Sequence, residues 1–251
     1  MDLGLRGRCY IATGASRGLG YATAEALVAD GARVIVSARD PDAVAAAVGR
    51  LGGDAQGLAG DLADATLPDR LCAQALAHGG RLDGALISVG GPPHGGVLDL
   101  PDDDWRQAFD SVFLGAIRLA RTVAAALGDG GAIAFVLSSS VRTPIGGLAA
   151  SNGLRPGLAM VAKELADLVG PRGVRVNSLL PGRIATARTL GLDERSGDAA
   201  AARAVNESAI PLRRYGEPAE FGRAAAFLLS PAASYICGTT LAVDGGALRA
   251  L

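Results

Sequence analysis

Three glycines that follow a short β-rich run could hold the phosphates of a dinucleotide. Gly14, Gly18 and Gly20 lie between a predicted strand at residues 8–12 and an Ala-rich predicted helix at residues 21–30. Because glycines lack side chains, the backbone can bend sharply there, and a pyrophosphate can approach the amide groups at the start of the helix. The pattern therefore predicts a phosphate-binding turn. The same turn also contains Ser16, Arg17 and Leu19.

An arginine ends the second predicted strand, at the position where a carboxylate would select NAD. This strand, at residues 33–37, leads into Ala38-Arg39, and no acidic residue stands at that point. Arg39 and Arg17 offer planar guanidinium groups, which suit a 2′-phosphate. The two arginines therefore predict NADP in preference to NAD, although solvated surface charge is the alternative for each of them.

A second group of polar residues could move a proton. Ser151 and Arg155 are one helical turn apart and share a face of the predicted helix at residues 151–169. Arg155 can bond ribose hydroxyls, but it does not release a proton near neutrality, and a serine hydroxyl is a far weaker acid than a phenol of pKa about 10. His94, in the loop 91–96, titrates near neutrality and is the candidate proton donor. An exposed loop histidine without a catalytic role is the alternative.

Strands and helices alternate along the chain, and this alternation predicts how these residues are positioned. Alternating elements favour parallel strands with right-handed crossovers. We therefore predict one α/β domain over residues 1–251, a Rossmann fold with a doubly wound, mostly parallel seven-stranded sheet and helices on both faces. The predicted strands are 8–12, 33–37, 55–59, 85–89, 132–137, 175–180 and 240–243, and the predicted helices are 21–30, 41–51, 67–78, 102–127, 151–169 and 219–229.

The segment 183–211 interrupts this alternation. It is polar, rich in alanine and longer than an ordinary connection, which is typical of a mobile lid over a substrate site. A surface helix without functional consequence is the alternative.

From end to end, the chain resembles the short-chain dehydrogenase/reductase family. The spacing Thr-Gly-x-x-x-Gly-x-Gly at residues 13–20 is typical of that family, and segments 214–218 and 238–246 are similar to its acyl-carrier-protein ketoreductase branch. The resemblance implies a nicotinamide cofactor and a small-molecule substrate. It also implies further cofactor contacts at Asp61, Leu62, Gly90, Arg155, Pro181, Gly182 and Thr186.

The same resemblance implies a catalytic Ser, Tyr, Lys and Asn, and most of these are replaced. Ser151 and Arg155 stand at the positions of the Tyr and the Lys, and the sequence contains no Tyr-x-x-x-Lys at any position. Val112 stands at the position of the Asn. The run of serines at residues 138–140 supplies the Ser. Ser139 or Ser138 fits the usual distance to residue 151 best.

Composition argues against several other classes of protein. With 24 Lys and Arg against 25 Asp and Glu, the chain has no single-signed field that would hold nucleic acid or an anionic membrane surface. No stretch approaches the roughly 20 apolar residues that cross a bilayer, and no export signal is visible, so we expect a cytoplasmic protein. The three cysteines, Cys9, Cys72 and Cys237, are widely scattered. We expect buried thiols, with no disulfide framework and no metal site.

Three functions remain open at this point. The first is an NADP(H)-dependent oxidoreductase of the family that acts on a carbonyl or alcohol, with Ser151 and Arg155 in an atypical active site. The second is a non-redox enzyme on the same scaffold, and the third is a catalytically silent dinucleotide-binding subunit. The retained cofactor residues favour the first. The resemblance also implies a homo-oligomer, a tetramer formed through helices 104–127 and 151–169 and the last strand.

Overall fold

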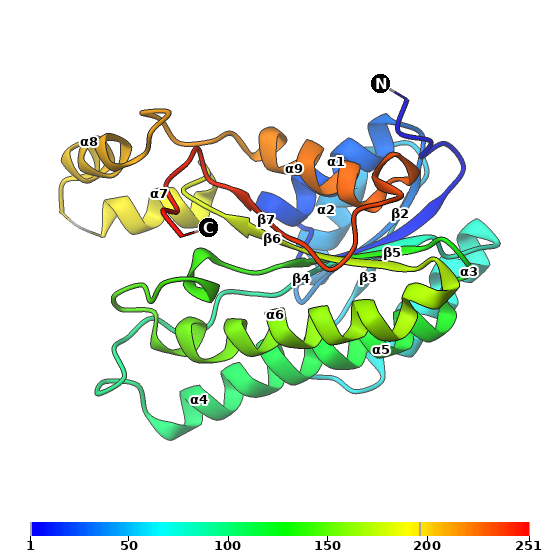
Figure 1. The fold of residues 1–251 in the computed structure, drawn as a ribbon, viewed down its shortest axis with the longest axis horizontal. Coiled ribbons are helices and arrows are strands. Elements are labelled where there is room, and N and C mark those ends of the chain that lie inside the picture. The colour runs from blue at the N-terminus through cyan, green and yellow to red at the C-terminus, as the bar shows by residue number, and fades with distance from the viewer. Residues whose placement is uncertain (1, 196, 251) are drawn as a thin grey trace.

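Seven parallel strands form one sheet in the order β3-β2-β1-β4-β5-β6-β7 in the computed structural model, which describes residues 2–195 and 197–250 (Figure 1). The prediction of a doubly wound Rossmann sheet is confirmed. Because the order reverses between β1 and β4, the connections from these two strands diverge, and the fold leaves a crevice beyond their carboxyl ends. The strands are β1 Cys9–Thr13, β2 Arg33–Ala38, β3 Ala55–Ala59, β4 Gly84–Ser88, β5 Ala132–Val136, β6 Arg175–Pro181 and β7 Thr240–Val243.

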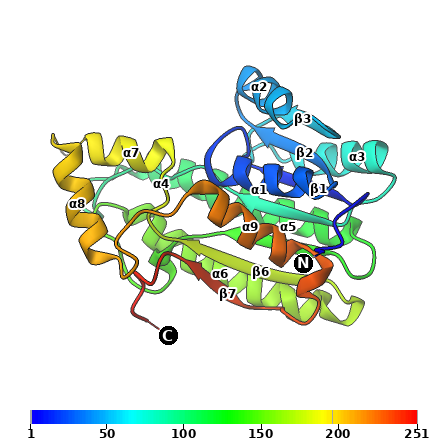
Figure 2. The same cartoon turned by 90° about the horizontal axis from the view of Figure 1, so that it is seen from above.

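Helices cover both faces of the sheet (Figures 1 and 2). One face carries α1 Gly18–Ala29, α2 Pro41–Leu51 and α9 Pro218–Leu229. The other carries α3 Leu67–Gly79, α4 Asp102–Ala108, η1 Phe109–Leu114, α5 Gly115–Ala126 and α6 Ala149–Val169. The helix that the sequence predicts over residues 102–127 is therefore continuous but includes the π-helical turn η1, a feature that often marks functional sites.

Alternating side chains of the central strands build the two halves of the core. In β1, Cys9 and Ile11 face the layer of α3, α5 and α6, whereas Tyr10 and Ala12 face the layer of α1 and α9. All of the residues of β1, β4 and β5 are buried, which explains why these strands read as continuous apolar runs. Sheet and helices together form the rigid base that positions the loops at the carboxyl ends of the strands.

The segment 183–211 folds into two helices, α7 Ala187–Glu194 and α8 Ala199–Ala209, beyond the carboxyl end of β6 (Figure 2). The buried carboxylate of Asp193 ties this segment together. It accepts hydrogen bonds from the Tyr215 hydroxyl at 2.8 Å and from Asn206 at 3.1 Å, and it pairs with Arg183 at 3.2 Å. The sequence analysis gave this segment no helix bounds and offered a surface helix only as the alternative to a lid, so the two helices are an addition to it.

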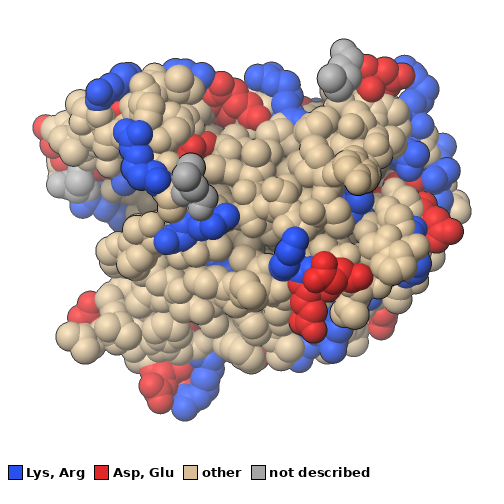
Figure 3. Space-filling view, in the orientation of Figure 1, with Lys and Arg blue, Asp and Glu red and all other residues tan. Residues whose placement is uncertain are grey.

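The surface agrees with the balanced composition. Acidic and basic side chains are interspersed in Figure 3, with broad uncharged areas between them. Among the described residues, none of the helices combines the length and apolarity that a bilayer crossing requires, and no cluster of three or more His, Cys, Asp or Glu side chains is placed to hold a metal ion.

Cys9 and Cys72 are buried as expected, but Cys237 is exposed, so the prediction for that thiol is wrong. It lies in the turn before β7, outside both apolar clusters.

Candidate cofactor and active site

The glycine turn after β1 is so closely packed that two of its positions accept only glycine. Gly14 has a φ of +57°, and a Cβ atom there would lie 2.6 Å from the carbonyl oxygen of Ser88 at the end of β4. A Cβ atom on Gly20 would lie 2.5 Å from the carbonyl oxygen of Gly14. The Thr13 hydroxyl joins the same two strands, since it donates to the Ser88 carbonyl at 3.0 Å and accepts from the Ser88 amide at 3.1 Å. The turn therefore lies directly on the β1–β4 boundary.

The amino end of α1 remains open to an anion. Its N-cap residue, Arg17, makes no side-chain capping bond, and the first turn of the helix contains no acidic residue. Helix amino ends carry unsatisfied amide donors and a positive dipole, which together favour a phosphate. Arg50 of α2 braces the turn from outside, because it donates to the Ser16 carbonyl at 2.9 Å and stacks over Tyr21 at 4.4 Å. Sequence analysis missed Arg50, since nothing in its local pattern separates it from other surface arginines.

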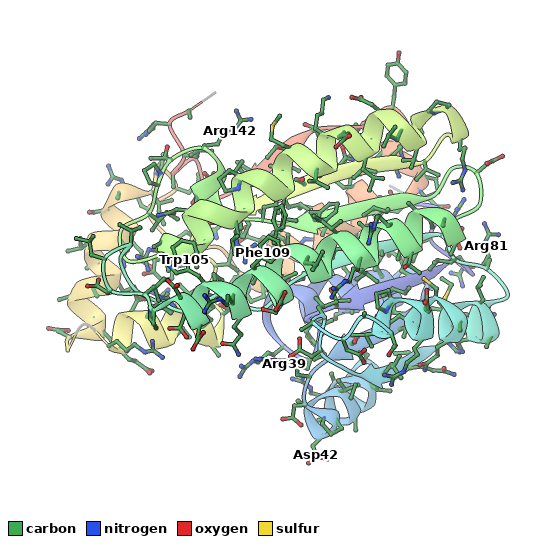
Figure 4. All side chains as sticks on the ribbon, turned by 90° about the horizontal axis from the view of Figure 1, so that it is seen from below. Arg39, Asp42, Arg81, Trp105, Phe109 and Arg142 are labelled. Carbon is green, nitrogen blue, oxygen red and sulfur yellow. The ribbon has the colours of Figure 1, made fainter. Side chains whose placement is uncertain are left out.

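Arg17 and Arg39 both extend into solvent beside this turn. Figure 4 shows Arg39 at the point where β2 gives way to α2. Neither arginine forms an ion pair with any residue in 2–195 or 197–250. Their guanidinium groups are therefore available to a ligand.

The remaining predicted cofactor residues lie in the loops that follow β3, β4 and β6. Asp61 is exposed and accepts a hydrogen bond from the Ala63 amide at 2.9 Å, and Leu62 packs against Gly115 of α5. Gly90 is exposed after β4. Pro181 is the last residue of β6, and Gly182 follows it and donates its amide to the Val243 carbonyl at 3.0 Å.

Thr186 is brought to the glycine turn from a distant part of the chain. Its hydroxyl caps α7 by accepting from the Thr189 amide at 3.3 Å. Its methyl group lies 3.7 Å from the position of a Cβ atom on Gly18. The segment 183–211 and the start of α1 are therefore neighbours.

Ser151 is buried and faces a serine that the sequence analysis did not choose. Its hydroxyl lies 3.1 Å from the hydroxyl of Ser140, and both residues are 4% exposed. Ser138 accepts a hydrogen bond from the Ser140 amide at 3.1 Å, and Ser138 and Ser139 are both half-buried. Of the three serines, Ser140 is thus the one paired with Ser151, whereas Ser138 and Ser139 stay partly accessible. Only its membership of the run 138–140 could have pointed to Ser140.

Arg155 is buried behind the end of β5. Its Nη1 donates to the carbonyl oxygens of Val136 at 2.9 Å and Leu137 at 3.0 Å. Burial, with a smaller contribution from the charge of Arg188, lowers the pKa of Arg155 to about 10. The Nη1 atom of Arg155 therefore holds the end of β5. A contact of its other guanidinium nitrogens with the cofactor ribose remains a prediction.

The loop that carries His94 is fixed to the start of α6. The Gly95 amide donates to Gly147 at 2.9 Å, and the Ala149 amide donates to Gly95 at 3.1 Å. His94 itself is exposed, but partial burial and then the charges of Arg188 and Arg195 lower its pKa. No hydrogen bond within the described chain joins it to one of the serines at 138–140 or 151.

Comparison with known proteins identifies the family. A protein-family model described as enoyl-(acyl carrier protein) reductase matches residues 14–247. The chain is 36% identical over 247 residues to an uncharacterised oxidoreductase of Mycobacterium tuberculosis, covering 94% of this chain and 90% of that protein. It is 31% identical over 246 residues to a 3-oxoacyl-[acyl-carrier-protein] reductase of Vibrio harveyi, covering 97% and 98%. The chain belongs to the short-chain dehydrogenase/reductase family.

Solved structures agree with this assignment. A short-chain dehydrogenase/reductase from Serratia marcescens superposes with a TM-score of 0.89 at 28% identity, over 98% of this chain and 99% of that one. L-sorbose reductase from Gluconobacter frateurii, solved with NADPH and L-sorbose, superposes with a TM-score of 0.93 at 27% identity, over the full length of both chains.

In this short-chain dehydrogenase/reductase, the predicted residues gather at the carboxyl ends of the strands. The structure brings together the glycine turn and Thr186, and it brings the serine run to Ser151 and the loop of His94 to the start of α6. Val112, which the sequence analysis aligns with the family's Asn, is 2% exposed inside the π-helical turn η1. An apolar side chain there contributes packing to the core and offers no hydrogen bond.

Proposed function

We propose that this protein is an NADP(H)-dependent oxidoreductase that interconverts a carbonyl compound and an alcohol. The observation that carries the proposal is the glycine turn at the open amino end of α1, with Thr186 beside it. The relatives support it, because one is a 3-oxoacyl-[acyl-carrier-protein] reductase and a structural neighbour is a reductase complexed with NADPH.

The residues present fit NADP. In this assignment, the amides of residues 18–20 bind the pyrophosphate, since the helix start supplies donors and no competing carboxylate. Arg17 and Arg39 bind the 2′-phosphate, for which the free guanidinium groups are suited. When bound, the nicotinamide supplies the redox chemistry that no side chain of this protein can provide. Asp61, Leu62, Gly90, Pro181 and Gly182 complete the proposed cofactor contacts.

Proton transfer in the proposed site is atypical. Ser138 or Ser139 would bind the substrate oxygen, because these two residues are only half-buried, whereas Ser140 is buried. His94 is the proposed proton donor, since its imidazole is exposed beside the start of α6. Replacing a well-placed acid with a poorer one typically costs about a hundredfold to ten-thousandfold in rate, so we expect slow turnover.

One observation favours a second candidate, a catalytically silent dinucleotide-binding subunit. Ser151 and Arg155 both form hydrogen bonds inside the protein, Ser151 with Ser140 and Arg155 with the carbonyl oxygens of Val136 and Leu137. Residues used in this way can stabilise a fold without acting on a substrate. A non-redox enzyme on the same scaffold also remains open.

Two further proposals concern the mobility of the segment 183–211 and the oligomeric state of the protein. We propose that the segment 183–211 closes over the substrate, since α7 extends Arg188 onto the loop after β4. We also propose a homotetramer. Light scattering coupled to size-exclusion chromatography tests the assembly, and a dimer or monomer at micromolar concentration would refute it.

Calorimetry with NADPH and NADH, followed by a panel of ketones and alcohols, tests the function. We expect NADPH to bind and its absorbance to change only when a substrate is present, with the product confirmed by mass spectrometry. Binding without turnover on any substrate would support the silent subunit, and product formation without a change in absorbance would support a non-redox enzyme. Absence of binding by either nucleotide refutes all cofactor-dependent readings. The His94→Asn variant should bind NADPH normally and turn over more slowly if His94 donates the proton.

A further inference from the structure

Positive charge gathers between the lid and the carboxyl ends of β4 and β5. Arg188 extends from α7 onto the loop after β4, so closely that a Cβ atom on Gly91 would overlap its guanidinium group. Its charge lowers the pKa of His94, in the same loop, and the pKa of Arg155, on α6. Arg195, at the end of α7, also lowers the pKa of His94. The charges of arginines from two separate elements, α7 with its C-cap residue and α6, thus act on the region around the loop of His94.

Arg188, Arg155 and Arg195 form no ion pair within residues 2–195 and 197–250. The nearby acid Asp193 is occupied by Arg183, Asn206 and Tyr215. Although Arg188 reaches solvent, the surrounding protein lowers its pKa, as does burial for Arg155. Protein sites seldom keep partly desolvated cations together unless an anion joins them.

We propose that the substrate carries an anionic group, a carboxylate or a phosphate ester, and that Arg188 binds this group beside His94. The proposal rests on the proposed function, because it assigns the substrate class to that same site. A guanidinium group is well suited to this task, since its planar donors match the oxygens of a carboxylate or phosphate in pairs.

The position of Arg188 favours the substrate over the cofactor as the source of the anion. Arg188 lies against Gly91 in the loop after β4, and its charge acts on His94 of the same loop and on Arg155 of α6. At the proposed phosphate contacts of residues 17–20, the residue of the segment 183–211 that lies against the turn is Thr186, whereas Arg188 lies against Gly91. The cofactor phosphates also have donors of their own at the start of α1. Arg188 is therefore free to select among substrates.

Binding to the NADPH-saturated protein tests the proposal. The probes are 2-oxobutyrate, its neutral analogue 2-oxobutanamide, and inorganic phosphate. We expect 2-oxobutyrate or phosphate to bind at least about tenfold more tightly than the amide, and Arg188→Gln to remove this preference without changing the affinity for NADPH. Arg223→Gln, which removes the same charge from the exposed face of α9, should keep the preference.

Two results would overturn the proposal. Equal binding of acid, phosphate and amide, or no binding by any of them, would show that the cationic space does not select anions. Loss of NADPH affinity in Arg188→Gln, with the acid preference unchanged, would assign the arginine to the cofactor.

A second readout works without turnover and without NADPH. His94 and His78 are the only histidines, so proton NMR can follow both rings, with the His94→Asn variant to assign them. An anion bound at Arg188 offsets a charge that lowers the pKa of His94, so 2-oxobutyrate should raise that pKa. An unchanged titration of His94 at saturating anion contradicts the proposal. If NADPH fails to bind the wild-type protein, the proposed function fails, and this titration still decides whether the anion site exists.

Discussion

Arg39→Ala should weaken NADPH binding and leave NADH binding unchanged. Arg39 is exposed and forms no ion pair with a described residue, so its removal costs the folded chain little, within about 0.5 kcal/mol. A hydrogen bond to a charged group contributes about 1.5–3 kcal/mol. Loss of the contact to the 2′-phosphate therefore predicts a rise in the dissociation constant for NADPH of about tenfold to about 150-fold. NADH has no such phosphate, and its affinity should stay within about twofold of the wild-type value.

Isothermal calorimetry with both nucleotides measures the effect, and two further variants sharpen it. Arg17→Ala should act in the same direction, whereas Arg223→Ala, on the exposed face of α9, should change neither affinity. Arg39→Asp should improve NADH binding, because a carboxylate at the end of β2 can accept hydrogen bonds from both ribose hydroxyls. Equal weakening of NADPH and NADH in Arg39→Ala would refute the reasoning, since the arginine would then act on a part common to both nucleotides.

Two predictions concern stability. Gly20→Ala should lower the free energy of unfolding by about 1–3 kcal/mol and weaken NADPH binding, because its Cβ would lie 2.5 Å from the Gly14 carbonyl oxygen. Urea titrations measure the effect, with Gly49→Ala in α2 as the control. Because Gly49 has open space around it, this variant should be neutral or stabilising by up to about 1 kcal/mol. Equal losses in both variants would contradict the packing argument. Hydrogen bonds from Arg214 lower the pKa of Glu220 from 4.5 to about 2. The carboxylate thus stabilises the fold above pH 4.5, and this contribution is lost as pH falls toward 2. Between pH 4.5 and pH 2, the wild-type protein should therefore lose more stability than Glu220→Gln. Equal losses would argue against the ion pair as the cause.

The order of strands and helices was predictable because it depends on local patterns. Short-range spacing predicts several elements, among them the apolar strands β1, β4 and β5 and the turn that contains the glycines at residues 14–20. The structure places these elements as predicted. Boundaries moved by a few residues, since helix ends depend on caps and neighbours as well as on pattern. The helices α7 and α8 escaped prediction because their polar, Ala-rich segment lacks a strong apolar period. They are held instead by the hydrogen bonds around Asp193, which no local rule contains.

By itself, the sequence determined the family, the parallel sheet and the phosphate-binding turn, because each depends on residues that are neighbours along the chain. Only the tertiary structure decided which groups meet at the candidate site. It paired Ser151 with Ser140, directed Arg155 to the end of β5, and brought Arg188 from the segment 183–211 onto Gly91, in the loop of His94. These contacts join α6, the lid and the β4 loop, which are distant in sequence. Their partners are chosen by packing and by the direction of each side chain, and neither of these can be read from spacing alone.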